Sequence, residues 1–418
     1  MNLETATRYR QALDYISSAV GHVDARQRAL ERFLASGLPT PRLEDWKYTA
    51  LDALERSPWH APEHARDALP DSGDTPGTRV AFGNGRLVHT GGQPQREHSL
   101  AAHVDDARAR QVFDSLAGDA ALTQINRALW QDGLWLHVPA GQVAPPVFAV
   151  HYASEADAML HTRNLVVLEA GAQAVLVEHY RGVPDRAYWQ NPVTEIVLGE
   201  GAHLDHLTLT EEGAAASHTG LAVVRQARHS RYSALSVNIG GRLVRHETRV
   251  NLDGPHAECR LDGLFIADTR RHIDQHLHVE HAAPRTTSRQ TWRGIAAGRG
   301  RGIFDARVVV HAGAQQADAQ QSSRNLLLSP HAEIDVKPQL EIHADDVKCG
   351  HGATVGQLDE AQVFYLRSRG IDAVTARALL LRAFAEEALG WLKNSGLAGW
   401  LEPHLAAALR LQEGERTA

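Results

Sequence analysis

The sequence predicts a mainly β protein in which an all-β centre, built as a solenoid, lies between two helical segments. Apolar residues recur at helical spacing before about residue 57 and again after Asp359. Between these segments, short runs of β-forming residues follow one another without a helical pattern. Turn residues recur among the runs at steps of 26 to 30 residues, which is typical of stacked coils.

The N-terminal segment is expected to be helical because its apolar residues fall mostly three or four positions apart. These residues are Ala12, Ile16, Val20, Val23, Leu30, Phe33 and Leu34. The loop Gly37–Pro41 ends the pattern, and residues 60–80 are rich in Pro, Asp, Gly and Ala, as in an exposed connection. We assign residues 1–105 to an N-terminal helical domain and its linker.

The centre of the chain consists of short predicted strands separated by tight turns. The first strands are expected at Leu134–Val138, Val147–Tyr152, Leu165–Leu168, Ala174–Glu178, Glu195–Leu198 and Leu204–Leu209. The turns are marked by Gly171, Gly201, His229, Pro255, Ala283 and Gly313. A β-solenoid explains this regular spacing, and a sandwich or jelly roll is the competing all-β architecture.

After Asp359 the pattern becomes helical again. Glu360–Arg369 is a short predicted helix that ends at Gly370, and a second helix begins at Asp372, a suitable N-cap. An apolar stripe follows on this second helix, which is expected to reach about Trp391. Residues 359–418 are therefore assigned to a C-terminal helical domain, after a core of residues 106–358.

Composition limits the possible functions. The 418 residues carry a net charge of −7, which argues against nucleic-acid binding as the main role. None of the four lysines follows a glycine, so the chain contains no Gly-Lys-Ser/Thr phosphate loop and is expected to bind no nucleotide. The start of the chain shows no secretory signal and there are only two cysteines, so we expect a reducing, cytoplasmic setting.

Cys349 and His351 are the strongest candidate site residues. They are two positions apart, so on a strand both side chains leave the same face. A thiolate and an imidazole on one face can hold a soft metal or activate a nucleophile. The alternative is a small buried cysteine beside a hydrogen-bonded histidine. Gly350 and Gly352 flank His351 and permit close approach by a ligand.

Histidines are otherwise numerous, and most of the 25 are interpreted as surface residues. One cluster, His272–His281, contains His276 and His278, which share a face if the segment is a strand. Zinc ligation is conceivable there. A polar outer face of a solenoid coil explains the cluster as well. Signatures of nucleophilic hydrolases and of zinc helices are absent from the sequence.

Several motifs follow one another along the chain, at Pro39–Thr49, Asn126–Ala128, Leu326–Ser329, Lys337–Ile342, Asp345–Cys349, His351–Gly356 and Phe364–Ile371. Together they resemble the SufB/SufD family of iron–sulfur cluster assembly proteins. The order and spacing of the later motifs are highly specific. His351-Gly-Ala stands where SufB has His-Glu-Ala, which favours the SufD branch of the family. The chain departs from the family at Gly350, often Ser, and at Asp305-Ala306, where a turn is expected to differ.

The resemblance implies a right-handed parallel β-helix core flanked by helical domains. It also implies a non-catalytic scaffold that forms a heterodimer with SufB and binds the SufC ATPase through the C-terminal helical domain. Phe364, Tyr365, Arg367, Arg369 and Gly370 would form the SufC-docking element. His351, assisted by Cys349, would be the ligand of a transient iron–sulfur cluster shared with SufB.

The cysteine content agrees with a shared cluster, because such clusters are usually held by four protein ligands, mostly thiolates. Two cysteines 90 residues apart cannot supply such a set, so a partner must contribute sulfur ligands. When the chain is isolated, the free edge of a β-helix makes a homodimer plausible. The alternative functions are a β-helix enzyme acting on polysaccharide and a solitary His-rich metal-binding module.

Overall fold

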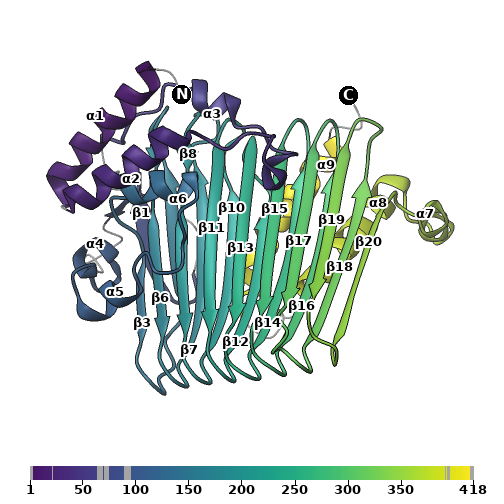
Figure 1. The fold of residues 1–418 in the computed structure, drawn as a ribbon. Coiled ribbons are helices and arrows are strands. Elements are labelled where there is room, and N and C mark those ends of the chain that lie inside the picture. The colour runs from purple at the N-terminus through teal and green to yellow at the C-terminus, as the bar shows by residue number, and fades with distance from the viewer. Residues whose placement is uncertain are drawn as a thin grey trace.

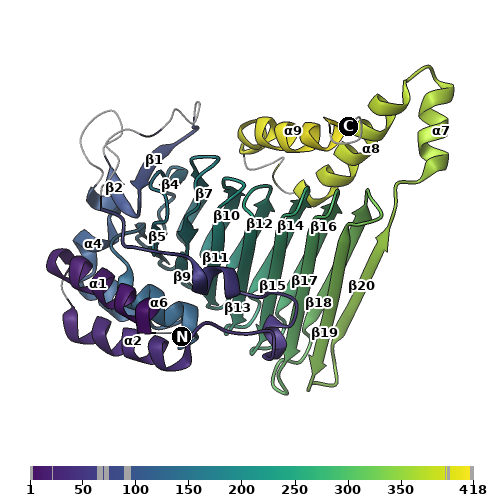
Figure 2. The same cartoon turned by 90° about the horizontal axis from the view of Figure 1, so that it is seen from above.

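The computed structural model describes residues 3–20, 22–63, 69, 75–88, 96–390, 392 and 396–414. A long parallel β-solenoid forms the body, with helices at both ends of the chain (Figures 1 and 2). The N-terminal helices are α1 (Leu3–Val20), α2 (Val23–Ser36), α3 (Asp52–Arg56), α4 (Leu100–His103), α5 (Ala107–Val112) and α6 (Ala121–Leu129). Helices α1, α2 and α6 share one apolar cluster, which packs beside the first coils. The predicted solenoid with flanking helices is confirmed, and the sandwich and jelly-roll alternatives are wrong.

The solenoid consists of two sheets to which successive strands contribute in alternation. Sheet I contains β2 (Arg86–Val88), β1 (Thr78–Gly83), β4 (Val147–Ala153), β7 (Gln173–Gly182), β10 (His203–Glu211), β12 (Arg231–Asn238), β14 (Glu258–Ala267), β16 (Thr287–Ala296), β18 (Asp318–Leu327) and β20 (Lys348–Gly356). Sheet II contains β3 (Trp135–Val138), β6 (Arg163–Leu168), β9 (Val193–Leu198), β11 (Ser217–Gln226), β13 (Leu243–Leu252), β15 (His272–His281), β17 (Arg301–Val310) and β19 (Glu333–Ile342), joined by β5 (Met159–Leu160) and β8 (Trp189–Gln190). All pairings between these strands are parallel except that of β1 with β2.

The main apolar core lies between the two sheets and runs through successive coils. Each strand points alternate side chains into this core, so residues in register form rows along the solenoid. One row of sheet I comprises Tyr232, Cys259, Ser288, Ala319 and Cys349, each on the next strand of the sheet. The rows explain why side chains far apart in the sequence become neighbours.

A column of left-handed backbone positions marks the turn before each strand of sheet I from β4 to β18. The column comprises Gly141, Gly171, Gly201, His229, His256, Arg285 and Gln316, with φ between 57° and 70°. Each of these residues donates its backbone N–H to the turn of the following coil, as Gly171 does to Glu200 O at 2.8 Å. The predicted turn spacing is therefore confirmed, and stacked turns are its physical cause.

The C-terminal helices are α7 (Glu360–Ser368), α8 (Ala373–Glu386) and α9 (Ala398–Gly414), with a short 3-10 turn, η3 (Glu387–Leu389), after α8. Helices α8 and α9 cover the outer face of sheet I (Figure 2). Apolar residues of α8 and α9, such as Leu381 and Leu401, pack against Val177, Leu207 and Leu235 of the sheet. Trp391, the predicted end of the second helix, lies outside the described residues. No described helix is long and apolar enough to span a bilayer.

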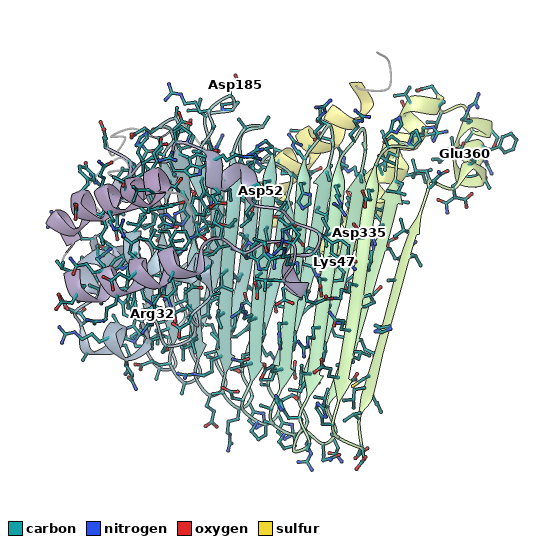
Figure 3. All side chains as sticks on the ribbon, turned by 45° about the horizontal axis from the view of Figure 1, so that its top comes forward. Arg32, Lys47, Asp52, Asp185, Asp335 and Glu360 are labelled. Atoms are coloured by element: carbon teal, nitrogen blue, oxygen red, sulfur yellow. The ribbon has the colours of Figure 1, made fainter. Side chains whose placement is uncertain are left out.

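The outer face of sheet II is crossed by residues 37–51, which we call the strap and which include η1 (Glu44–Trp46). Figure 3 shows Lys47 of the strap lying over the strands. Thr49 donates a hydrogen bond to the buried Asp274 carboxylate at 2.5 Å, and the Arg245 guanidinium lies 3.9 Å from the centre of the Trp46 ring. These contacts tie the predicted N-terminal motif to the centre of the solenoid.

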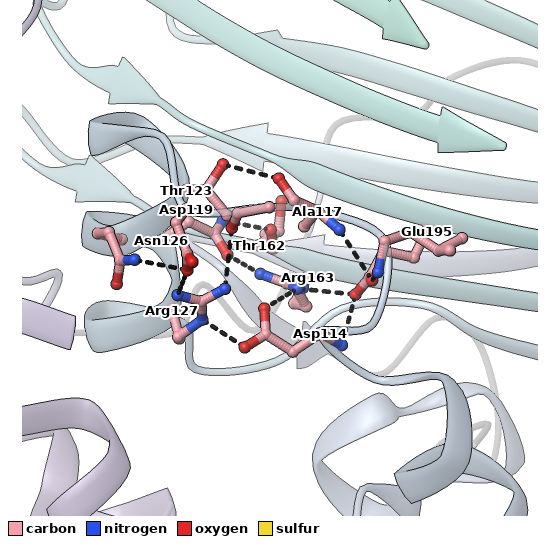
Figure 4. Close-up of polar contacts among 12 residues, drawn as sticks. Asp114, Ala117, Asp119, Thr123, Asn126, Arg127, Thr162, Arg163 and Glu195 are labelled. Atoms are coloured by element: carbon pink, nitrogen blue, oxygen red, sulfur yellow. Dashed lines mark hydrogen bonds and ion pairs between the residues drawn. The ribbon is translucent and has the colours of Figure 1, made fainter. Parts of the chain in front are cut away.

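A buried ion network joins the last N-terminal helices to the first coils (Figure 4). Arg163 and Glu195 are both fully buried, and their side chains make a 2.7 Å ion pair. Arg163 also contacts Asp114, while Glu195 accepts the backbone N–H groups of Asp114 and Leu116, each at 2.7 Å. The Glu195 carboxylate therefore accepts hydrogen bonds from a loop and also pairs with the charge of Arg163. These additional hydrogen bonds offset the free-energy cost of burying an ion pair.

The histidines are divided between the interior and the surface. Seven of them are buried: His151, His161, His179, His206, His218, His246 and His281. Several of these face polar partners between or beneath the sheets, such as Glu178, which lies 3.2 Å from the His206 imidazole. The other described histidines are at least partly exposed, as predicted for most of them.

One prediction from the sequence is wrong. Asp305 and Ala306 lie within strand β17 and form no turn.

Candidate functional site

Cys349 and His351 lie on β20, the last strand of sheet I, directly before the C-terminal helices. Their register partners on β18 are Ala319 and Gln321, both of which are buried in the solenoid interior. Both candidate side chains therefore leave the inward face of the sheet, as the two-residue spacing predicts. Because β20 belongs to the final coil, no further coil stacks over them.

The two candidates differ in exposure. Cys349 is half-buried against the apolar core, and this burial raises the pKa of its thiol above the usual range. The thiol is therefore protonated at neutral pH, and it would become a ligand only when a metal displaces the proton. His351 is exposed, with Gly350 and Gly352 on either side pointing to the outer face. An exposed imidazole in its neutral form can bind a metal directly.

The final coil leaves backbone hydrogen-bonding groups open. Within the described part of the chain, β20 pairs only with β18, and β19 pairs only with β17. Side chains along β20 are mostly exposed, whereas those of inner strands such as β14 are mostly buried. An uncovered parallel edge of this length is a ready surface for pairing with another chain.

The predicted docking residues lie on α7 and in the turn directly after it, and α7 projects from the body (Figure 2). Phe364 is 71% exposed and Tyr365 is 58% exposed, and Arg367 and Arg369 are exposed beside them. Gly370 has a φ of 89° and ends the helix. Asp372 then caps α8 by accepting the backbone N–H groups of Val374 and Thr375, each at 3.0 Å. The geometry therefore gathers the five predicted docking residues on one protruding element.

The His272–His281 cluster forms strand β15, with His276 and His278 on the outer face of sheet II. The His276 imidazole lies 2.8 Å from Asp274, and the His278 imidazole lies 3.2 Å from Glu280. Each histidine is thus engaged with a carboxylate of its own strand, and the strap covers part of the cluster. These contacts fit a polar outer face.

Sequence reasoning missed one group of potential ligands. His179 of β7, Glu211 of β10 and His404 of α9 bring their ligand atoms within 4.8 Å of one another. The group joins the solenoid to the C-terminal helices beneath Trp400. No local sequence motif indicates this group of ligands, because 193 residues separate Glu211 from His404.

The chain thus combines a parallel β-solenoid, helices at both ends and an inward-facing Cys–x–His on its final coil. Residues 151–384 match the family described as SUF system FeS cluster assembly, SufBD core domain. The chain therefore belongs to the SufBD family of the Suf iron–sulfur cluster assembly system.

Curated relatives agree with this assignment. The chain is 32% identical over 381 residues to the iron–sulfur cluster assembly protein SufD of Escherichia coli K12, covering 89% of each chain. It is 31% identical over 407 residues to a SufBD family protein of Synechocystis, covering 91% of this chain and 89% of the relative. The chloroplastic protein ABCI7 of Arabidopsis thaliana is 34% identical over 288 residues, 66% of this chain and 61% of that protein. The resemblance seen in the motifs is confirmed.

Proposed function

We propose that the chain is a cytoplasmic, non-catalytic scaffold that pairs with SufB, binds the SufC ATPase and supplies His351 to a transient iron–sulfur cluster. The observation that carries this proposal is the open final coil, which presents His351 and Cys349 on its uncovered inward face. Cluster assembly is the function of the family, and the chain alone has too few thiolates for a four-ligand site.

The open edge supports a partner of like structure. A related solenoid that presents its own last strand could continue the backbone ladder of β19 or β20 and bring thiolates to His351. SufB is the member of the same family that meets this requirement. In the absence of SufB, a second copy of this chain would occupy the same edge, so we expect the isolated protein to form a homodimer.

The ligand role of His351 is tested by replacing it with alanine in the co-expressed complex. His351 is exposed, so the variant should fold and retain both partners while iron and sulfide on the complex fall at least about tenfold. His343→Ala is the matched control, because His343 is an exposed histidine just before the same strand. Normal cluster content in His351→Ala would show that the ligand lies elsewhere.

The role of Cys349 is tested separately with Cys349→Ser, which keeps the size of the side chain. If the thiol only assists His351, cluster formation should slow without being abolished. Complete loss of clusters in Cys349→Ser, with normal clusters in His351→Ala, would reverse the assigned roles.

The docking role of α7 is best tested by point variants. Truncation after Leu358 would uncover the outer face of sheet I, since α8 and α9 bury it. Phe364→Ala with Tyr365→Ala removes two exposed apolar rings and should abolish co-purification of SufC without lowering the melting temperature. Leu43→Ala, which changes a 55% exposed apolar residue of the strap, is the control. Undiminished SufC binding by the double variant would contradict the docking role.

A further inference from the structure

The group His179, Glu211 and His404 has the geometry of a metal site. One carboxylate oxygen, Glu211 Oε2, lies 3.1 Å from His179 Nε2 and 3.1 Å from His404 Nδ1. Ligands at about 2.0–2.1 Å around a tetrahedral ion are separated by roughly 3.3–3.5 Å, so little movement is needed to admit one. Two imidazoles and one carboxylate suit borderline divalent ions such as Zn²⁺ and Fe²⁺.

The protonation states favour a cation. Burial lowers the pKa of His179 to about 4, so its ring is neutral at physiological pH. Burial alone would raise the pKa of Glu211, but the contacts with His179 and His404 lower it below the usual range, so the carboxylate is ionised. A neutral His179 ring beside the Glu211 carboxylate therefore suits a cation under the C-terminal helices.

Without an ion, both rings can donate their N–H groups to Glu211. An ion would replace these two hydrogen bonds, and each neutral ring would then carry its proton on the other nitrogen. For His179 that nitrogen is Nδ1, which is buried and has no hydrogen-bond partner among the described residues. Moving the proton to Nδ1 therefore sacrifices no existing hydrogen bond on that side of the ring.

The site is enclosed on one side and accessible on the other. The Trp400 ring lies 5.5 Å from the His179 ring and 5.0 Å from the His404 ring, between centroids, and forms an apolar wall. The side chain of Glu211 is 30% exposed and that of His404 is 17% exposed. Water can therefore enter with the ion and occupy a fourth coordination position.

We propose that His179, Glu211 and His404 bind one borderline divalent transition-metal ion, of the Zn²⁺ or Fe²⁺ class. The ion fastens α9 to strands β7 and β10 and so fixes the C-terminal helices on the outer face of sheet I. This site is separate from the inward-facing His351, and the proposal does not rest on the proposed scaffold function.

The test uses Co²⁺ as a visible probe on the full-length chain after treatment with a chelator. One equivalent of Co²⁺ should produce d–d absorption that Zn²⁺ abolishes by competition. His404→Gln keeps an N–H donor toward Glu211 but provides a poor metal ligand, so it separates metal binding from hydrogen bonding. The variant should bind Co²⁺ at least about tenfold more weakly.

Two controls locate the site. His278→Ala removes a histidine that is paired with one carboxylate only, and His351→Ala removes the other candidate ligand. Both variants should keep the Co²⁺ absorption, and Zn²⁺ should raise the melting temperature of the unmodified chain but not that of His404→Gln. Equal Co²⁺ binding by the unmodified chain and His404→Gln, or no stoichiometric binding by the unmodified chain, would overturn the proposal. The three residues would then form a hydrogen-bonded network only.

Discussion

Cys259 and Cys349 occupy the same inward-facing row of sheet I, three strands apart. Ser288 and Ala319 lie between them in register. Neighbouring strands are about 4.8 Å apart, so three steps separate the two backbones by roughly 14 Å. A disulfide requires Cα atoms within about 7 Å, so the two thiols cannot pair within one folded chain.

We therefore predict two free thiols of very different reactivity. Cys349 is half-buried on the open coil, whereas Cys259 is enclosed in the core and burial raises its pKa to about 12. Titration with a thiol reagent at pH 8 should modify Cys349 at least about a hundredfold faster than Cys259. Cys349→Ser should abolish the fast phase. A fast phase that survives this substitution would mean that Cys259 is accessible.

The buried histidines should make the protein less stable in mild acid. Burial lowers the pKa of His151 to about 4 and the pKa values of His218 and His246 to about 3, against an ordinary value of 6.5. Below pH 6.5 the unfolded chain binds protons that the folded protein does not accept. The free energy of unfolding is therefore complete above pH 6.5 and falls as the pH drops, until each folded-state pKa is reached.

Each such histidine contributes a slope of about 1.4 kcal/mol per pH unit within that window. Urea unfolding at pH 7.5, 6.5 and 5.5 measures the slope, and His246→Gln should flatten it by about one such contribution. The exposed His331 provides the control, since His331→Ala removes no buried imidazole. A free energy of unfolding that stays constant between pH 6.5 and 5.5 would contradict the argument.

The Arg163–Glu195 pair should be among the most sensitive positions for stability. Glu195→Ala leaves the buried guanidinium without one of its two carboxylate partners at 2.7 Å and frees three backbone N–H groups. We expect a loss of about 3–5 kcal/mol in the free energy of unfolding. Glu200→Ala is the matched control, because its pair with Arg228 is more than half exposed and should contribute less than about 1 kcal/mol. Similar losses in denaturant unfolding of both variants would refute the distinction.

The column of left-handed turn positions predicts a loss of stability that comes from backbone conformation alone, without a packing clash. Gly201 has a φ of 66° and a Cβ added there meets no atom within 4 Å, so Gly201→Ala should destabilise by about 1–2 kcal/mol through its backbone alone. Gly313 also has open space for a Cβ, but its φ lies outside the left-handed region. Gly313→Ala should therefore be neutral or stabilise by up to about 1 kcal/mol. If Gly201→Ala and Gly313→Ala changed the melting temperature equally, backbone conformation would not be the cause.

The architecture was predictable because stacked coils repeat their turns. Left-handed turn positions recur every 27 to 31 residues along the column from Gly141 to Gln316, and strands lie between them. The spacing of Cys349 and His351 likewise predicted a shared face, which the register with β18 confirms. Strict alternation in a strand makes such local geometry readable from sequence.

Contacts between distant segments were not predictable from single-sequence patterns. Strand β1 joins β4 from a segment adjoining the predicted linker, and the pairing depends on tertiary contacts. Buried histidines such as His218 resemble surface residues until their partners are known; Glu212 lies 2.7 Å away on the same coil. The ligand group of His179, Glu211 and His404 requires the packing of α9 on sheet I, which no local period encodes.

The two ends of the solenoid differ, because helices pack beside the first coils whereas the final coil is uncovered. This difference has a consequence for the synthesis of the chain. A ribosome releases the helices α1, α2 and α6 and the first coils before β19 and β20 exist, and domains tend to fold in that order. Each completed coil then provides the strands with which the strands of the next coil pair. The uncovered coil of β19 and β20 therefore appears only after all the earlier coils have been synthesised. This order shortens the time during which nascent chains on one polysome can associate through that coil.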